Sequence, residues 1–144
     1  MSRWRKRIFA SAEAEPSDPR HKLGRRGEDA AAKHLRQLGW KVLHRNFRAP
    51  EGGEVDLVCR DGNTLVFAEV KTRARSSEIS RPADNVTDEK ERLVARGALA
   101  WLRLLGDPDI EFRFDIIEVI LPPDQVAEIT VNEAAFTLPK GWRY

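Results

Sequence analysis

The stretch Gly53–Arg73, GEVDLVCRDGNTLVFAEVKTR, decides the fold of this chain. Two apolar runs flank a short polar turn, and this pattern predicts a β-hairpin. The turn residues Gly62 and Asn63 are small and polar, as tight hairpin turns require. With the turn centred between them, the register of the two strands is fixed, so the sequence predicts which side chains face one another.

That register places Asp56 opposite Glu69, and Glu54 opposite Lys71. Directly opposed like charges destabilise a sheet unless one takes a proton or a cation lies between them. Facing carboxylates suit a hard divalent cation such as Mg²⁺ or Mn²⁺. Lys71 follows Glu69 by two residues and so shares its face of the strand, where an ammonium could serve an attacking water. The hairpin therefore favours a metal site with a lysine beside it.

The same spacing also allows a ladder of surface ion pairs. In that arrangement Glu54 pairs with Lys71, and Asp56 pairs with Arg73 or Arg60. Because an Asp followed by Glu-x-Lys is common by chance, the spacing alone leaves both interpretations open.

Composition indicates a single soluble globular domain, because 41% of the 144 residues are hydrophobic and 33% are charged. Cys59 is the sole cysteine, which excludes an intrachain disulfide and a cysteine zinc cluster. The histidines show no metal-ligand spacing. No apolar stretch reaches the roughly 18–20 residues that span a membrane, and the start lacks a secretory signal. We therefore expect a cytoplasmic protein with no membrane association.

Positive charge is concentrated at the start of the chain. Residues 1–22 are rich in Arg, Lys and Pro and lack an apolar period, so we expect a disordered basic arm followed by a folded domain at 23–144. Such an arm suits a polyanion such as nucleic acid. A tail that only improves solubility is an equally good interpretation.

A first helix is predicted over residues 24–38, because Ala31 and Leu35 recur at helical spacing and Gly39 can end it. Glu28 lies on the same inward stripe. A carboxylate on a buried face needs a partner, which makes Glu28 a candidate third acid of the site. The alternative is a favourable interaction with the helix N-terminus.

The remaining chain predicts an α/β fold with a mixed sheet. Residues 40–47 and 110–121 read as strands, Thr87 can cap a second helix, and the tail can add an edge strand. A helix between two strands favours a crossover connection. Basic side chains near the hairpin and the helix starts are candidate nucleic-acid contacts: Arg25, Arg26, Arg73, Arg75 and Lys90.

Four segments, GRRGEDAAAKHLRQLGWKVLHRNFR, GGEVDL, VFAEVKTR and RFDIIEV, resemble the YraN-type family of small bacterial proteins, over roughly residues 23–136. That family is placed in the restriction-endonuclease-like PD-(D/E)xK fold, close to archaeal Holliday-junction resolvases. The resemblance implies that Glu28, Asp56 and Glu69 hold Mg²⁺ or Mn²⁺, and that Asp56, Glu69 and Lys71 are catalytic. Glu91 stands where the family tends to have glutamine.

We therefore expect a restriction-endonuclease-like α/β fold, a mixed central β-sheet flanked by helices. The expected function is that of a metal-dependent nuclease that hydrolyses phosphodiester bonds in DNA, with branched or structured DNA among the candidate substrates. A homodimer would suit a junction, in which two strands must be cut. One alternative is a non-catalytic nucleic-acid-binding protein with a degenerate nuclease fold. Another is a structural or partner protein whose acids form salt bridges.

Overall fold

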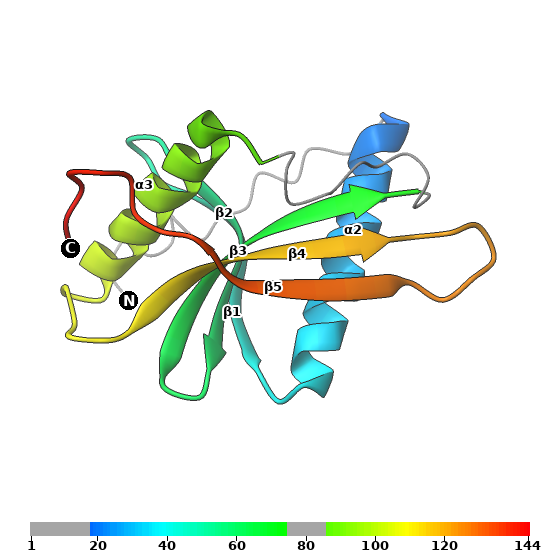
Figure 1. Cartoon of the computed structure of the whole chain (residues 1–144), viewed down its shortest axis with the longest axis horizontal. Helices are drawn as coiled ribbons and strands as arrows, with labels where there is room; N and C mark the ends of the chain where they lie inside the picture. The colour runs from blue at the N-terminus through cyan, green and yellow to red at the C-terminus, as the bar shows by residue number, and fades with distance from the viewer. Residues whose placement is uncertain (1–17, 75–85) are drawn as a thin grey trace.

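The structure is a computed structural model that describes residues 18–74 and 86–144. Its five strands form one sheet in the order β1-β2-β3-β4-β5 (Figure 1). β3 and β4 are parallel, whereas the other neighbouring pairs are antiparallel, so the sheet is mixed. The elements are α2 (Pro19–Gln37), β1 (Lys41–Arg48), β2 (Glu54–Asp61), β3 (Thr64–Arg73), α3 (Asp88–Leu104), β4 (Phe112–Ile120) and β5 (Glu128–Phe136).

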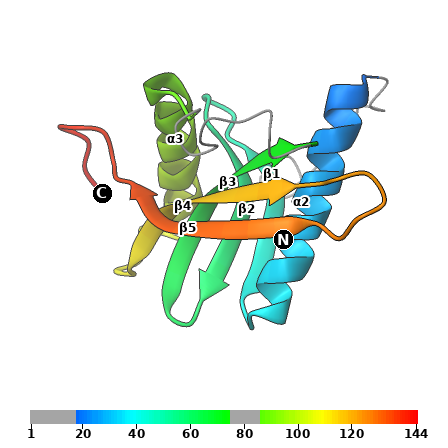
Figure 2. The ribbon, with the colours of Figure 1, turned by 45° about the vertical axis from the view of Figure 1, so that its right-hand side comes forward.

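The two helices lie on opposite faces of this sheet (Figures 1 and 2). α3 connects the parallel strands β3 and β4, which is the crossover that the sequence predicts. The expected mixed sheet flanked by helices is confirmed, and it is consistent with a restriction-endonuclease-like fold. Within residues 18–74 and 86–144, no helix is long and apolar enough to cross a membrane.

A separate apolar core lies under each helix. The α3-side core contains large aromatic side chains, including Phe47, Phe67 and Trp101. The α2-side core is mostly aliphatic, and the small side chains of Ala31 and Ala32 let this helix approach the sheet closely. Two independent layers therefore fix the helices, and the ends of the central strands lie between them.

The first helix starts earlier than predicted. It begins at Pro19 rather than at residue 24, and the Asp18 side chain accepts a hydrogen bond from the Arg20 N–H as the N-cap. Proline fits the first helical position because its missing N–H is not needed there. Residues 19–22 are therefore helical, which corrects the prediction of disorder for them. Residues 1–17 of the predicted basic arm lie outside the described residues.

The predicted hairpin register is confirmed over most of its length. β2 and β3 pair from Leu57 with Ala68 to Asp61 with Thr64. Gly62 in the turn has a φ of 58°, a left-handed conformation that glycine adopts readily. The ladder ends at Leu57 and Ala68, so the strands are no longer paired where the acidic residues begin.

Two glycines set the distance between α3 and β2. A Cβ on Gly53 would lie 2.4 Å from the Gly97 nitrogen, and a Cβ on Gly97 would lie 2.8 Å from Val55 Cγ2. Only residues without side chains allow this approach. The contact holds α3 against the start of β2, which places the first turn of α3 over the acidic residues.

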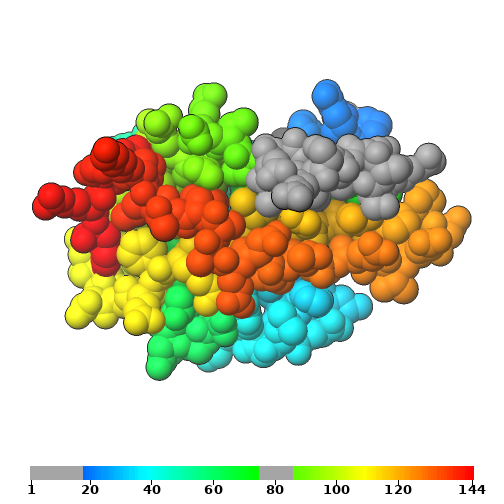
Figure 3. Space-filling model, viewed as in Figure 1, coloured from blue at the N-terminus to red at the C-terminus, as the bar shows by residue number. Residues whose placement is uncertain are grey.

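The tail adds β5 as an edge strand, as predicted. β5 crosses the front of the molecule in Figure 3, below α3. Leu105 is the exposed C-cap residue of α3.

Candidate functional site

The regular alternation of β2 breaks at Asp56. Leu57 packs in the α2-side core, whereas Val55, two residues away, packs in the α3-side core. Residues two apart share a face in a regular strand, so the backbone must turn between them. Asn46 lies across from Asp56 on β1, between the pairs that flank it, and has a left-handed φ of 53°. This irregularity lets Asp56 face the gap between β2 and β3.

The Asp56 carboxylate is fixed by the backbone of β3. Its Oδ2 accepts a hydrogen bond of 2.9 Å from the Val70 N–H. The backbone pairing of β2 with β3 ends at Leu57 and Ala68, so beyond that point this side-chain hydrogen bond connects the two strands. The predicted direct strand pairing of Asp56 with Glu69 is thus absent from the ladder, but the two carboxylates remain electrostatic neighbours.

Glu69 is the most buried acid of the site, with 4% of its surface exposed. Burial and the Asp56 carboxylate raise its pKa from 4.5 to about 9, against the opposing effect of Lys90 and Lys71. Its Oε2 is buried and has no hydrogen-bond partner among the described residues. A buried, unpartnered carboxylate oxygen beside a second acid is costly to maintain, so this is a position where a cation would be stabilising.

Lys90 reaches the site from the first turn of α3. Its Nζ lies 2.5 Å from Glu54 Oε1 and 3.7 Å from Glu69 Oε1. Thr87 starts the helix as predicted, accepting a hydrogen bond from the Lys90 N–H through its hydroxyl. Both neighbouring acids raise the Lys90 pKa, although burial lowers it. Lys90 therefore points from α3 back toward the hairpin.

The predicted pairing of Glu54 with Lys71 is wrong, because Glu54 binds Lys90 on α3 instead. Arg60, another member of the alternative ion-pair ladder, donates to the Gly62 carbonyl in the turn. The acids are therefore contacted from a helix, because the close approach of α3 brings a cation over the strand ends. The hairpin does not form the strand-to-strand ladder that the spacing allowed.

Lys71 shares the face of Glu69 and is close enough to lower the pKa of that carboxyl. Across the parallel pair it lies in register with Glu118 on β4. Glu118 Oε1 in turn accepts a hydrogen bond of 3.0 Å from Asn132 on β5. A row of polar residues thus crosses three strands beside Glu69.

Glu28 approaches Asp56 from α2. Burial, followed by the Asp56 carboxylate, raises the Glu28 pKa to about 7, and a hydrogen bond from Asn46 opposes this. Because the helix begins at Pro19, Glu28 lies well beyond its first turn, which contains no acid. The alternative that Glu28 stabilises the helix N-terminus is therefore wrong. Its neighbour Asp29 is exposed and binds Arg45.

The three predicted metal-binding acids meet pairwise around Asp56, which affects the pKa of both Glu28 and Glu69. Within the two described ranges, no group of three or more His, Cys, Asp or Glu side chains is already arranged to hold an ion. The donors are all carboxylate oxygens, which suit Mg²⁺ and Mn²⁺, and the unpartnered Glu69 Oε2 fits the need for a cation. The donor atoms therefore suit these ions, whereas the three carboxylates of the described residues are not arranged around one point as metal ligands are.

The predicted nucleic-acid contacts occupy two places. Arg25 and Arg26 are exposed on α2, immediately before Gly27. A Cβ on Gly27 would lie 1.9 Å from Thr72 Oγ1, so the helix backbone rests on the end of β3 next to Arg73. Arg73 Nε is buried and has no hydrogen-bond partner among the described residues. Lys90 contacts carboxylates instead, and Arg75 lies outside the described residues.

Sequence reasoning missed Asn46 and Asp115. Asn46 lies in a strand, and asparagine tolerates a left-handed φ better than most residues. This tolerance is the one feature of the sequence that indicates an irregular backbone there. Asp115 is completely buried and accepts hydrogen bonds from Arg113 Nε and the Ala134 N–H, both at 3.0 Å. The bond from Ala134 joins β4 to β5, and the bond from Arg113 lies within β4, so Asp115 supports the sheet rather than the acidic site.

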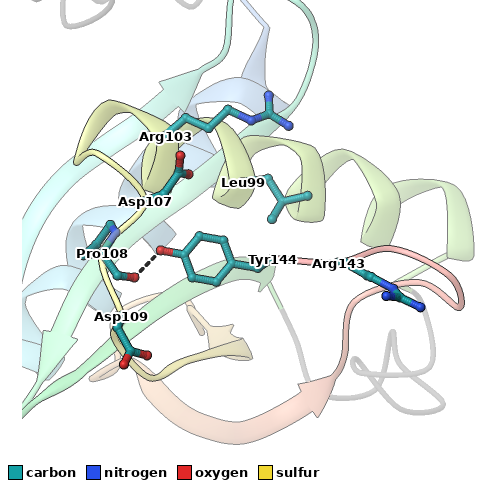
Figure 4. A pocket seen from close by; sticks show the side chains of 7 residues that line it. All are labelled: Leu99, Arg103, Asp107, Pro108, Asp109, Arg143 and Tyr144. Atoms are coloured by element: carbon teal, nitrogen blue, oxygen red, sulfur yellow. Dashed lines mark hydrogen bonds between the residues drawn. The ribbon is translucent and has the colours of Figure 1, made fainter.

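An open pocket lies at the other end of α3 (Figure 4). The Tyr144 hydroxyl donates a hydrogen bond to the Pro108 carbonyl across it. None of the predicted site residues lines it. Its lining residues are Leu99, Arg103, Asp107, Pro108, Asp109, Arg143 and Tyr144.

The fold and the site define an α/β protein of restriction-endonuclease-like architecture with acidic residues at the diverging ends of its central strands. Comparison of the sequence with known families identifies the relatives. The chain belongs to the family described as "Uncharacterised protein family UPF0102", whose model matches residues 27–119. This confirms the resemblance drawn from the sequence. The matched region contains Glu28, Asp56, Glu69, Lys71 and Lys90.

Individual relatives support the same assignment. A UPF0102 protein of Geobacter sulfurreducens is 52% identical over 103 residues, which is 71% of this chain and 79% of the relative. One from Caldicellulosiruptor saccharolyticus is 37% identical and covers 81% of this chain and 98% of its own length. One from Symbiobacterium thermophilum is 43% identical, covering 80% and 96% respectively.

Proposed function

We propose that this protein is a metal-dependent nuclease that hydrolyses phosphodiester bonds in DNA, with branched or structured DNA among its substrates. The observation that carries the proposal is the Glu69 carboxyl group. It is buried beside Asp56, its pKa is raised, and its Oε2 has no partner among the described residues. The raised pKa means that this acidic pair holds a proton where a divalent cation would bind instead, and DNA-cleaving sites commonly use such a cation.

In this proposal Glu28, Asp56 and Glu69 hold Mg²⁺ or Mn²⁺. The ion, when bound, neutralises negative charge on the phosphate and acidifies a water. The Val70 N–H holds Asp56 through Oδ2, so in this proposal the other oxygen is the one that binds the ion. Lys71 orients the attacking water and stabilises the charge that develops on the phosphate oxygens.

Basic residues supply the contacts to the DNA backbone. Arg25 and Arg26 are exposed on α2, and the packing of Gly27 on Thr72 brings this part of the helix to the end of β3. Arg73 at that end keeps a buried donor without a partner among the described residues, which suits a phosphate oxygen. Arg75 and the basic arm remain part of the proposal, as does a cytoplasmic location.

The test measures metal binding and cleavage on the same purified full-length protein. Titration calorimetry with Mn²⁺ should show binding that Asp56→Asn and Glu69→Gln each weaken. Labelled linear duplex, four-way junction, single-stranded DNA and RNA should then be incubated with Mg²⁺ or Mn²⁺. We expect cleavage of a DNA substrate that Glu69→Gln and Lys71→Met abolish. Glu89→Gln, an exposed acid near Lys90, is the matched control and should cut normally.

The proposal fails if the wild-type protein binds no Mn²⁺ and cuts none of these substrates. It also fails if Glu69→Gln behaves like the wild-type protein in both measurements. A dimer that sediments as such and cuts both strands of a junction would support the proposed homodimer. A monomer would overturn the proposed homodimer.

A second function, non-catalytic nucleic-acid binding, is favoured by a different observation. The Lys90 ammonium already contacts Glu54 and Glu69, so part of the negative charge is balanced without a metal. In that case DNA or RNA binding should weaken steeply with salt, withstand a chelator and leave the nucleic acid uncut. Arg25→Gln with Arg26→Gln should weaken binding under either function, so cleavage is what separates the two.

A further inference from the structure

The position of Lys90 has a consequence for how the acidic site takes up a metal. Its ammonium lies 3.7 Å from Glu69 Oε1 and 2.5 Å from Glu54 Oε1. The Lys90 side chain is only 25% exposed, and Asp56 also acts on it electrostatically. The Lys90 ammonium therefore lies beside the carboxylates that bind a metal ion in the proposed function.

We infer that Lys90 is a built-in competitor for the metal, occupying the neighbourhood of Asp56 and Glu69 and withdrawing onto Glu54 when a divalent cation binds. This inference rests on the proposed function, because it concerns the same two acids. It goes further by assigning roles to Glu54 and Lys90, neither of which is a metal ligand in the proposal. Both are positioning residues that set the affinity for the ion.

Two like charges cannot share the space beside Glu69 at low cost. A unit positive charge about 4 Å from another is strongly repelled near a protein surface, where screening by water is incomplete. A divalent ion bound to Glu69 therefore has to displace the ammonium or leave it repelled.

Glu54 gives the displaced ammonium a place to go. It lies at the start of β2, is 37% exposed, and makes the shorter of the two contacts with Lys90. Lys90 lowers the Glu54 pKa, so this acid stays ionised and available as an anchor. The Gly53–Gly97 contact keeps β2 and α3 together, so the anchor and the ammonium stay within reach during the exchange.

The experiment measures Mn²⁺ binding by titration calorimetry at one mildly alkaline pH, without nucleic acid, so it does not depend on activity. Lys90→Met keeps the length of the side chain and removes the charge. We expect it to bind Mn²⁺ about tenfold more tightly, a modest part of the effect of a unit charge at this distance. Arg92→Gln removes one charge from the exposed side of the same helix and should leave the affinity unchanged.

Glu54→Gln tests the anchor. Without Glu54 the ammonium is left with Glu69, so Mn²⁺ binding should weaken severalfold. In the Lys90→Met background the same substitution should have no effect, because there is no ammonium left to anchor. A Glu54→Gln effect of equal size in both backgrounds would make Glu54 a direct ligand and overturn its assigned role.

The outcomes separate the inference from the proposed function. Mn²⁺ binding that depends on Asp56 and Glu69 but is unchanged by Lys90→Met overturns the inference alone. Binding by Lys90→Met with none detectable in the wild-type protein supports the inference, and the cleavage assay on the wild-type protein then decides the proposed function. Absence of binding in the wild-type protein and in Lys90→Met overturns both. Tighter binding by Arg92→Gln equal to that of Lys90→Met would reduce the effect to net charge and also overturn the inference.

Discussion

Gly53 rests on the backbone of Gly97 so closely that a Cβ on Gly53 would lie 2.4 Å from the Gly97 nitrogen. This contact joins the start of β2 to the middle of α3. About two turns earlier, toward the helix N-terminus, Lys90 of α3 reaches the acids. The position of a cation in the site thus depends on two residues that have no side chain.

Replacing Gly53 by alanine should lower the free energy of unfolding by about 3 kcal/mol, because the new methyl group meets α3 and φ is 108°. Gly52→Ala is the matched control. Its φ is 102°, but no atom lies within 4 Å of its Cβ position, so it should lose only about 1 kcal/mol. Urea unfolding measures both. An equal loss of unfolding free energy in the two variants would show that backbone strain, and not the contact with α3, makes alanine unfavourable at position 53.

A second pair of glycines tests the packing of α2. Gly27→Ala should destabilise the protein by about 1–3 kcal/mol, because the Cβ would lie 1.9 Å from Thr72 Oγ1. Gly24→Ala lies in the same helix with nothing within 4 Å, so it should stabilise by about 1 kcal/mol through helix propensity. Thermal unfolding of the two variants gives the comparison. Stabilisation by both substitutions would contradict the close contact with β3.

The metal-free protein should lose stability as pH rises. Burial raises the Glu69 pKa from 4.5 to about 9 in the folded state, so folding favours the protonated form. The favourable contribution is complete below about 4.5 and is lost progressively up to about 9. Glu28 adds the same effect up to about 7. Urea unfolding across this range, in a chelator, should show a falling free energy of unfolding.

Glu69→Gln should flatten that pH dependence, because glutamine resembles the protonated acid and cannot ionise. Saturating Mn²⁺ should act in the opposite direction and stabilise the wild-type protein more at the alkaline end, where the carboxylates are free of protons. A pH profile of Glu69→Gln that matches the wild-type profile would contradict the assignment to Glu69.

Asp115 should behave as a structural acid. Replacement by alanine leaves Arg113 without its buried partner and the Ala134 N–H without its acceptor, and should cost about 3 kcal/mol of stability. Its Mn²⁺ affinity, measured well below the unfolding temperature, should equal that of the wild-type protein. Asp56→Ala should show the reverse, with a large loss of Mn²⁺ affinity. Loss of Mn²⁺ affinity in Asp115→Ala would place that acid in the site.

Much of the fold could be predicted because its signals are local. The polar turn at Gly62 fixes the hairpin register, and Thr87 marks the start of α3. The predicted start of α2 is too late, because the N-cap Asp18 and the first helical residue Pro19 lie in a charged segment that has no apolar period. The acids Asp56 and Glu69 were found by their spacing, and Glu28 by its place on the apolar stripe of a helix.

By itself, the sequence determined the elements, the register and the choice of acidic residues, since these follow from patterns over a few neighbouring positions. Only the tertiary structure decided which groups the acids contact. The break in alternation at Asp56 and the pairing of Glu54 with Lys90 both depend on contacts between residues far apart in the chain. Periodicity assumes a regular strand, and it contains no information about which helix will lie over the strand ends. The packing of Gly53 on Gly97 fixes the position of α3 over the sheet, and this brings Lys90 to the acids.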